Sequence, residues 1–186
     1  MTYPEYAEIN GKKVKINTSY KVGLKCFDVI NDPDICDEER ALAVIFLLFG
    51  EIPVDGDGEA YLKMAEKYLT CGKGNKAVSE KPDIDFQQDE SYISASFMSD
   101  YKIDLSNTKM HWWQYCELIA GLTENSIMSR IRSIRTYDLS DVKDEKTRRK
   151  IIKAQNDVAI KPRRSAAELA AIDKFESLCS TGDINE

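Results

Sequence analysis

Apolar residues recur along most of the chain at the three- and four-residue spacing of amphipathic helices. The first such stripe consists of Tyr20, Leu24, Phe27 and Ile30. The run from residue 41 to 49 is apolar on every side, which predicts a helix buried at the centre of a bundle. Further helices are predicted near residues 59–69, 89–101, 108–120 and 141–161, after a cap at Thr123, and from residue 165 onward.

A short β-hairpin precedes the helices. Residues 6–9 and 13–16 alternate apolar with polar side chains, and Asn10-Gly11 lies between them. Asn-Gly tolerates the positive φ angles of a type I′ turn, which connects two antiparallel strands favourably. A lone hairpin is marginally stable in water, so it must pack against another element. We therefore predict a mainly α fold, a compact domain of about six to eight helices with a small N-terminal β-hairpin.

Charged residues are distributed unevenly along the chain. Residues 1–100 carry 11 Lys and Arg against 19 Asp and Glu, whereas residues 101–186 carry 15 against 13. The helix predicted at 141–161 is dense in charge and has a thin apolar stripe, which is typical of a helix that is not deeply buried. We expect a helical domain with the hairpin over residues 1–140. A charged C-terminal helical extension over residues 141–186 then packs on that domain or projects from it.

Two local patterns mark a loop and a helix start. The stretch from Gly72 to Asp89 is polar and contains Pro82, which predicts a mobile surface loop. Ser165 and Glu168 have the spacing of a capping box, in which each side chain accepts the free backbone N–H of the other residue. The last helix is therefore expected to begin at this pair.

The composition is that of a globular protein, with 42% hydrophobic and 31% charged residues. The longest apolar run has nine residues, whereas a helix that crosses a bilayer needs about 20. The N-terminus lacks the basic and apolar pattern of a signal peptide, and the five cysteines do not form an even framework. We expect a cytosolic protein with reduced thiols and no membrane span.

No motif indicates catalysis or a cofactor. His111 is the only histidine, and neither a nucleophile elbow nor an orienting acid accompanies it. The acidic turn from Asp55 to Glu59 is similar to the start of a calcium loop, but Ala60 stands where that loop needs Gly, and Lys63 is a cation. We therefore expect no catalytic, cofactor-binding or metal-binding residue and no enzyme activity.

His111, Trp112 and Trp113 stand side by side in the helix predicted over 108–120. One helical face combines Trp112, Tyr115, Cys116 and Ile119. A reactive histidine and a platform for stacking nucleic-acid bases are alternatives, but an apolar helical stripe usually belongs to a core. We interpret this stretch as a structural core helix and keep Trp112 as a candidate contact at the edge of a partner groove.

Basic residues gather on the helices predicted after Thr123 and on the segment that follows them. They alternate with acidic residues, and such mixed charge favours a solvated or protein-binding face over a nucleic-acid footprint, which is usually of one sign. The candidate partner-binding residues are Trp112, Arg130, Arg135, Arg148, Arg149, Arg163 and Arg164.

An ordered series of motifs carries a family resemblance. It comprises Asp85-Phe86 with Asp89, Tyr92 to Phe97, Tyr101 to Leu105, His111-Trp112-Trp113 and Gly121-Leu122. In this series the chain resembles the bacteriophage gene-product-fifteen family, found in long-tailed phages and prophages of Gram-positive bacteria. The resemblance is best from about residue 84 to residue 136 and extends more loosely over the whole chain.

The resemblance implies a gene among phage tail genes, near the tape measure gene, and a protein located in the host bacterial cytoplasm. We therefore expect a non-catalytic tail-assembly chaperone or adaptor whose partners are phage tail proteins, above all the tape measure protein. The alternative is a small helical regulator that binds nucleic acid through the Arg130–Arg164 surface, although the acidic composition makes nucleic acid the weaker expectation. Self-association into a homo-oligomer and retention in the virion both stay open.

Overall fold

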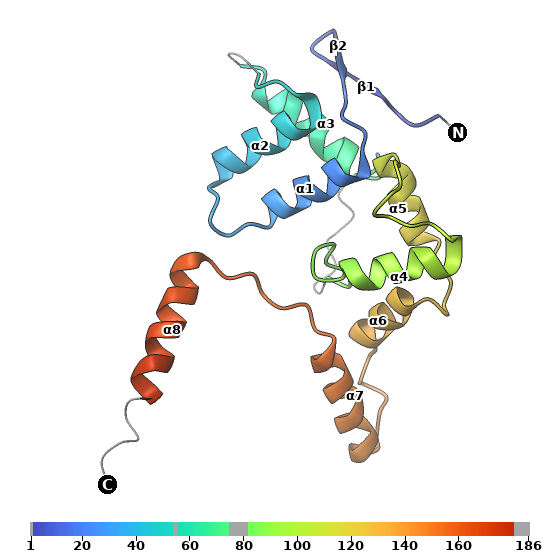
Figure 1. Ribbon diagram of the computed structural model, residues 1–186, viewed down its shortest axis with the longest axis vertical. Helices are drawn as coiled ribbons and strands as arrows, with labels where there is room; N and C mark the ends of the chain where they lie inside the picture. The colour runs from blue at the N-terminus through green and yellow to red at the C-terminus, as the bar shows by residue number, and fades with distance from the viewer. Residues whose placement is uncertain (1, 54–55, 75–81, 181–186) are drawn as a thin grey trace.

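The computed structural model describes residues 2–53, 56–74 and 82–180 (Figure 1). This described part contains eight helices and one two-stranded sheet, which confirms the predicted mainly α fold with an N-terminal hairpin. No helix within it is both long and apolar enough to cross a membrane. The elements are β1 (Tyr6–Ile9), β2 (Lys12–Lys15), α1 (Tyr20–Ile30), α2 (Asp37–Phe49), α3 (Gly58–Leu69), α4 (Glu90–Tyr101), α5 (Trp112–Ala120), α6 (Ile127–Thr136), α7 (Glu145–Asp157) and α8 (Ala166–Ser180).

The hairpin forms through its Asn-Gly turn, as predicted. Asn10 and Gly11 have φ angles of 48° and 76°, so both occupy the left-handed region that a type I′ turn requires. The turn pairs Ile9 with Lys12 in an antiparallel register. Ala7 and Ile9 are buried and β1 contacts α3, which supplies the packing partner that a lone hairpin needs.

Helices α1, α2 and α3 lie together beside the hairpin (Figure 1). Val44, Ile45 and Leu48 of α2 are buried against these neighbours. The prediction that this helix is buried on every side is wrong, because Leu42 and Phe46 are 43% and 54% exposed. The contacts of α2 are chiefly with α1 and α3, so its remaining face points outward.

Trp112 joins these three helices to α5. Its ring packs on Gly23 of α1 so closely that a Cβ atom there would lie 2.2 Å from a ring carbon. Its indole N–H donates to the Leu69 carbonyl at the end of α3, 3.1 Å away, and its backbone N–H donates to the Thr18 carbonyl at 2.8 Å. With 1% exposure, Trp112 lies at the centre of a core shared by α1, α3 and α5.

Two helix starts differ from the predictions. α5 begins at Trp112 rather than near residue 108, because the chain before it forms an isolated β-bridge and His111 acts as the N-cap. Thr123 does not cap α6, since its hydroxyl donates to the Asp100 carboxylate at 2.9 Å, and Ser126 caps that helix instead. Both differences arise from contacts that are distant in sequence.

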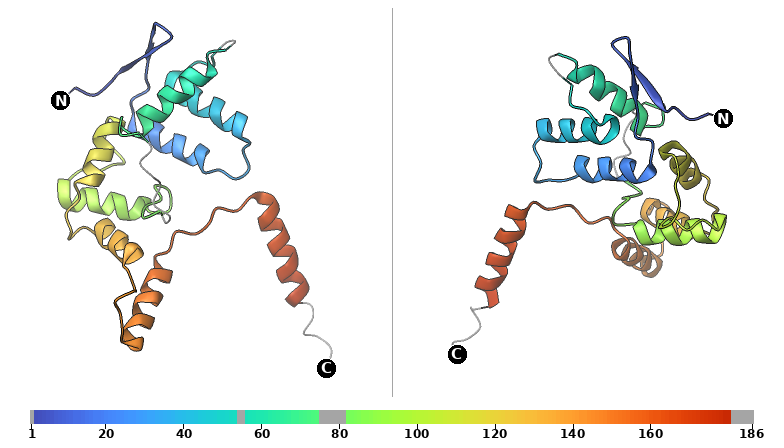
Figure 2. Two further views of the ribbon diagram at one scale, coloured as in Figure 1. Left: turned by 180° about the vertical axis from the view of Figure 1, so that it is seen from behind. Right: turned by 45° about the horizontal axis from the view of Figure 1, so that its top comes forward.

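The two C-terminal helices lie at the edge of the fold (Figure 2). α7 contacts α6 but has no buried residue. α8 stands apart from the other helices, and the backbone N–H of Ala166 at its start donates to the Asp34 carboxylate at 3.0 Å. The predicted capping box of Ser165 and Glu168 is confirmed, with bonds of 2.9 and 3.2 Å in the two directions. The extension over 141–186 as a unit of its own remains a prediction.

We predict that Gly23→Ala destabilises the fold. In an exposed helix Ala is more favourable than Gly, but here the new methyl group would lie 2.2 Å from the Trp112 ring. Displacement of that ring should lower the free energy of unfolding by about 1–3 kcal/mol. Urea denaturation followed by tryptophan fluorescence measures the change.

Gly58→Ala in the first turn of α3 is the matched control. Nothing lies within 4 Å of the Cβ position there, so the free energy of unfolding should stay within about 0.5 kcal/mol of the wild type. Equal stability of the two variants would contradict the close packing of Trp112 on α1.

Candidate partner-binding site

The seven candidate residues differ in exposure. Trp112 is 1% exposed, whereas the side chains of Arg135 and Arg163 are 9% and 22% exposed. The exposed candidates are Arg130, Arg148, Arg149 and Arg164. The structure thus brings two of the arginines into an internal network and leaves four at the surface.

Trp112 lies in an aromatic core rather than at a surface. The ring centroids of Phe27, Phe86 and Tyr115 are 5.6, 5.7 and 5.8 Å from its own. The interpretation of this stretch as a structural core agrees with these contacts. The prediction that Trp112 contacts a partner is wrong, because its side chain is enclosed on all sides.

His111 is held as a structural group beside this core. Its Nδ1 accepts the backbone N–H of Trp113 at 3.0 Å, so a neutral ring carries its proton on Nε2. Nε2 lies 3.1 Å from the Pro4 carbonyl and donates to it, and the ring stacks on Tyr3 at a centroid distance of 4.9 Å. Neither ring nitrogen is therefore free to accept a proton from a substrate.

A network of arginines and aspartates joins the later helices. We name it the arginine clasp; its members are Arg132, Arg135, Arg163, Asp83, Asp85 and Asp89. At its centre, Arg135 on α6 donates two bonds of 2.6 and 2.7 Å to Asp89. The two side chains are 9% and 1% exposed, and the bond with Asp89 raises the pKa of Arg135. A buried ion pair is stable when its geometry is good and its other polar atoms are satisfied, and this pair is bidentate.

Arg135 also forms hydrogen bonds with the backbone of two other segments. It donates to the Val158 carbonyl at 2.6 Å and to the Asp83 carbonyl at 3.0 Å. Its partner Asp89 additionally accepts the backbone N–H of Asp85 at 2.9 Å. One ion pair thus gathers the start of α4, the end of α6 and the residue that follows α7.

The clasp also holds residues 82–89, the described end of the predicted mobile loop. Arg163 donates to both oxygens of Asp85 at 3.1 and 3.2 Å, and Gln88 exchanges two bonds of 2.9 Å with the Lys161 backbone. Burial would raise the pKa of Asp85, but hydrogen bonds from the Gln88 backbone and from Arg163 outweigh it and lower that pKa. The prediction of a mobile surface loop does not hold for this part, because these bonds pin it to the C-terminal segment.

Sequence reasoning missed the aspartates of the clasp. Arg132 and Asp83 are 49 residues apart and bond at 2.6 Å, while Arg163 and Asp85 are 78 residues apart. No local spacing connects such partners, so the arginines alone stood out as surface candidates. The signal in the sequence that could have indicated these aspartates was the motif around Asp85 and Asp89. The family resemblance includes that motif but gives it no role.

The acidic residues of α7 are Glu145 and Asp157 at its two ends, and five lysines and arginines lie between them. Arg149 pairs with Glu145 at 3.1 Å, and Arg148 donates to the Leu139 carbonyl at 3.3 Å. Asp144 caps the same helix with its carboxylate. Exposed pairs of this kind contribute little stability.

Large apolar side chains also reach the surface. Phe46 of α2 is 54% exposed, and Leu169 of α8 is 49% exposed. Phe46 borders a groove of about 640 Å³, named here the α2 groove, which residues 15–18 and 46–50 line. Apolar side chains beside a hollow are typical of ligand and protein contacts, so this groove suits a helical partner.

The acidic turn that is similar to a calcium loop is partly described, since Asp55 lies outside the described residues. Asp57 accepts a bond of 2.7 Å from the Asn10 amide, and Glu59 pairs with Lys63 at 2.7 Å. Over residues 2–53, 56–74 and 82–180, no group of three or more His, Cys, Asp or Glu is placed to hold a metal ion.

The chain matches a known protein family. The family described as "Bacteriophage Gp15 protein" matches residues 3–160, which contain every element from β1 to α7. No curated protein and no solved structure shows a significant match to the chain. The Arg135–Asp89 ion pair and the core around Trp112 lie inside the matched residues, whereas Arg163 and α8 lie beyond them.

We predict that Arg135→Met lowers the free energy of unfolding by about 3–5 kcal/mol, because it leaves the buried Asp89 carboxylate without its cation. Met retains much of the length and apolar volume of the arginine stem, so lost packing contributes less. Chemical denaturation measures the change.

Arg130→Met on the same helix is the control, since Arg130 is exposed and should tolerate the change within about 0.5 kcal/mol. If both variants unfold at the same denaturant concentration, the ion pair does not hold the later helices.

Proposed function

The chain belongs to the bacteriophage Gp15 protein family, and from this premise we propose that it is a phage tail-assembly protein. Its proposed role is that of a non-catalytic chaperone or adaptor for the tape measure protein in the host bacterial cytoplasm. The observation that carries the proposal is the family match over residues 3–160. The motif resemblance supports it, because it implies a gene near the tape measure gene.

The physical demands of this role suit the described surface. A tape measure protein is long, helical and apolar in places, so it needs cover before the tail tube assembles around it. An amphipathic helix binds by laying its apolar face into a groove. The α2 groove offers Phe46 at its edge, and Leu42, 43% exposed, lies one turn earlier on α2. Such binding needs no catalytic residue.

Nucleic-acid binding through the Arg130–Arg164 surface is the second candidate. Three of the arginines in this range, those at 132, 135 and 163, direct their donors to aspartates of the arginine clasp. The formal net charge of the chain is −6. The other lysines and arginines of this range belong to an acidic chain, so we expect only weak, salt-sensitive binding to phosphates, whose neutralisation supplies most of the affinity of non-specific binding.

We predict that the full chain binds a tape measure fragment at salt concentrations that abolish its binding to DNA. Association through apolar area tolerates salt, whereas phosphate contacts lose affinity steeply as salt rises. A pull-down of the fragment beside a DNA mobility-shift assay, each at a low and a high salt concentration, measures the difference.

Two variants separate the candidate functions. Phe46→Ser should weaken fragment binding about tenfold or more without loss of stability, since the side chain is 54% exposed. Reversal of charge at Arg130, Arg148, Arg149 and Arg164 should leave fragment binding unchanged and remove residual DNA binding. Tight, sequence-selective DNA binding without a tail-protein partner would reject the chaperone proposal in favour of a regulator.

A further inference from the structure

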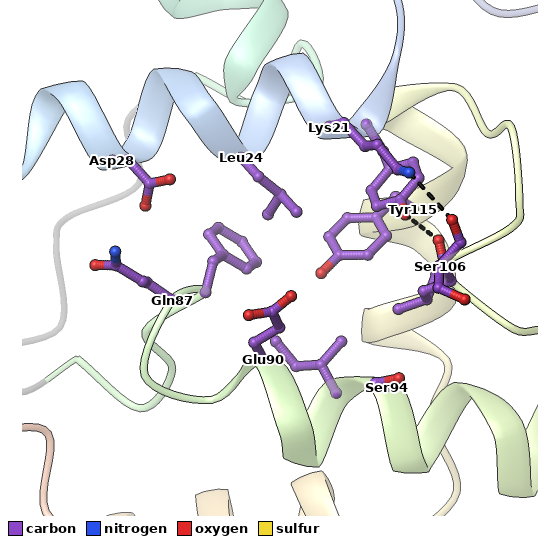
Figure 3. Close-up of a pocket in the computed structure, with 12 residues that line it drawn as sticks. Lys21, Leu24, Asp28, Gln87, Glu90, Ser94, Ser106 and Tyr115 are labelled. Atoms are coloured by element: carbon purple, nitrogen blue, oxygen red, sulfur yellow. Dashed lines mark hydrogen bonds between the residues drawn. The ribbon is translucent and has the colours of Figure 1, made fainter.

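A cavity of about 310 Å³ opens between α1, the start of α4, the chain after α4 and α5 (Figure 3). A single water occupies about 30 Å³ in the liquid, so the cavity has room for a whole side chain. Glu90 and Asp28 present carboxylates at its edge (Figure 3). Its apolar lining is formed by Leu24, Phe86, Ile93 and Leu105.

The Tyr115 hydroxyl lacks a partner in this cavity. The residue is 2% exposed, yet its hydroxyl forms no hydrogen bond with any residue that the structure describes. Neighbouring Tyr20, in contrast, donates to the Leu105 carbonyl. Figure 3 shows the Tyr115 hydroxyl pointing into the cavity toward Glu90. Burial raises the pKa of Tyr115, so the hydroxyl stays protonated at neutral pH. The hydroxyl oxygen faces the open space of the cavity, so a ligand atom that enters the cavity can form a hydrogen bond with it.

The two carboxylates differ in exposure, since Glu90 is exposed and Asp28 is half-buried. Neither Glu90 nor Asp28 forms a salt bridge or hydrogen bond with a described residue. Lys21, the cation among the lining residues, donates to a backbone carbonyl at 3.2 Å and lies at the far end from Asp28 (Figure 3). Burial raises the pKa of Asp28, and Arg163 opposes this effect while its guanidinium bonds to Asp85. The cavity therefore presents negative charge beside an apolar wall.

These features narrow the chemistry of an occupant. Two carboxylates repel an anion, and a purely apolar side chain would leave the Tyr115 hydroxyl unpartnered. A metal ion such as calcium needs six or more oxygen ligands close around it, and no metal-binding group occurs among the described residues. A guanidinium combines flat faces that pack on an aromatic ring such as Phe86 with several donors for carboxylate and hydroxyl oxygens.

We propose that this cavity binds an arginine side chain of a partner protein. The aliphatic stem lies along Leu24 and Ile93, while the guanidinium packs on Phe86 and donates to the Glu90 carboxylate and the Tyr115 hydroxyl oxygen. Asp28 adds attraction from the outer edge. The inference rests on the proposed function in one respect, which is that the partner carrying the arginine is a phage tail protein.

The test uses the full chain and small blocked amino acids, so it does not require the tape measure protein. Nα-acetyl-arginine methylamide is titrated against the labelled protein, and chemical shifts of Tyr115, Ser94 and Leu24 are followed by NMR. We expect saturable shifts at these cavity residues, with a dissociation constant of roughly a few millimolar for a single side chain. The neutral citrulline analogue should give no saturable shift.

Variants of the cavity complete the test. Glu90→Gln should weaken binding about tenfold, and Tyr115→Phe, which keeps the ring, about threefold. Glu124→Gln, at an exposed glutamate outside the cavity lining, is the matched control and should bind like the wild type. Heteronuclear spectra of each variant confirm that its fold is intact.

Several outcomes would overturn the proposal. These are the absence of saturable shifts up to the solubility limit of the probe, equal binding of the citrulline or lysine analogue, and unchanged affinity in Glu90→Gln. If the protein binds blocked arginine but forms no complex with a tail protein, the cavity site stands and the proposed function is rejected. If a tail-protein complex forms but the cavity does not bind arginine, the proposed function stands and the cavity site is rejected.

Discussion

The buried ion pair between Arg135 and Asp89 is the interaction on which the later half of the fold depends. Removing both charges from water is costly, and the pair is stable because its two bonds of 2.6 and 2.7 Å are joined by further bonds to surrounding backbone. These bonds place the end of α6 against the start of α4 and the residue after α7. The rest of the clasp then positions residues 82–89 and the segment that leads to α8.

A second constraint lies on the other side of the core. Trp112 occupies the space that Gly23 leaves on α1, and its indole N–H reaches the end of α3. Trp112 and Arg135, which look suited to ligand binding in the sequence, thus serve to hold the fold together. What remains for partners is less conspicuous in sequence, namely the α2 groove beside Phe46 and the acidic cavity beside Tyr115.

Local chemistry explains which parts of the fold were predictable. The Asn10-Gly11 turn and the periodic apolar stripes are short-range signals, so the hairpin and the helices follow from them. The outward face of α2 did not follow, because its exposure depends on how many helices pack around it. The clasp was hidden for the same reason, since Arg135 and Asp89 are 46 residues apart. The cavity likewise combines residues from α1, α4, α5 and the chain around them, which no spacing rule connects.

The proposed function makes one central claim, that this chain covers apolar helical segments of the tape measure protein by direct contact. The most direct measurement is the soluble fraction of the tape measure protein when it is expressed alone and together with the full chain. The expected result is a marked rise in that fraction and a complex that survives gel filtration at high salt, because apolar contacts tolerate salt. An unchanged soluble fraction without a complex would contradict the claim.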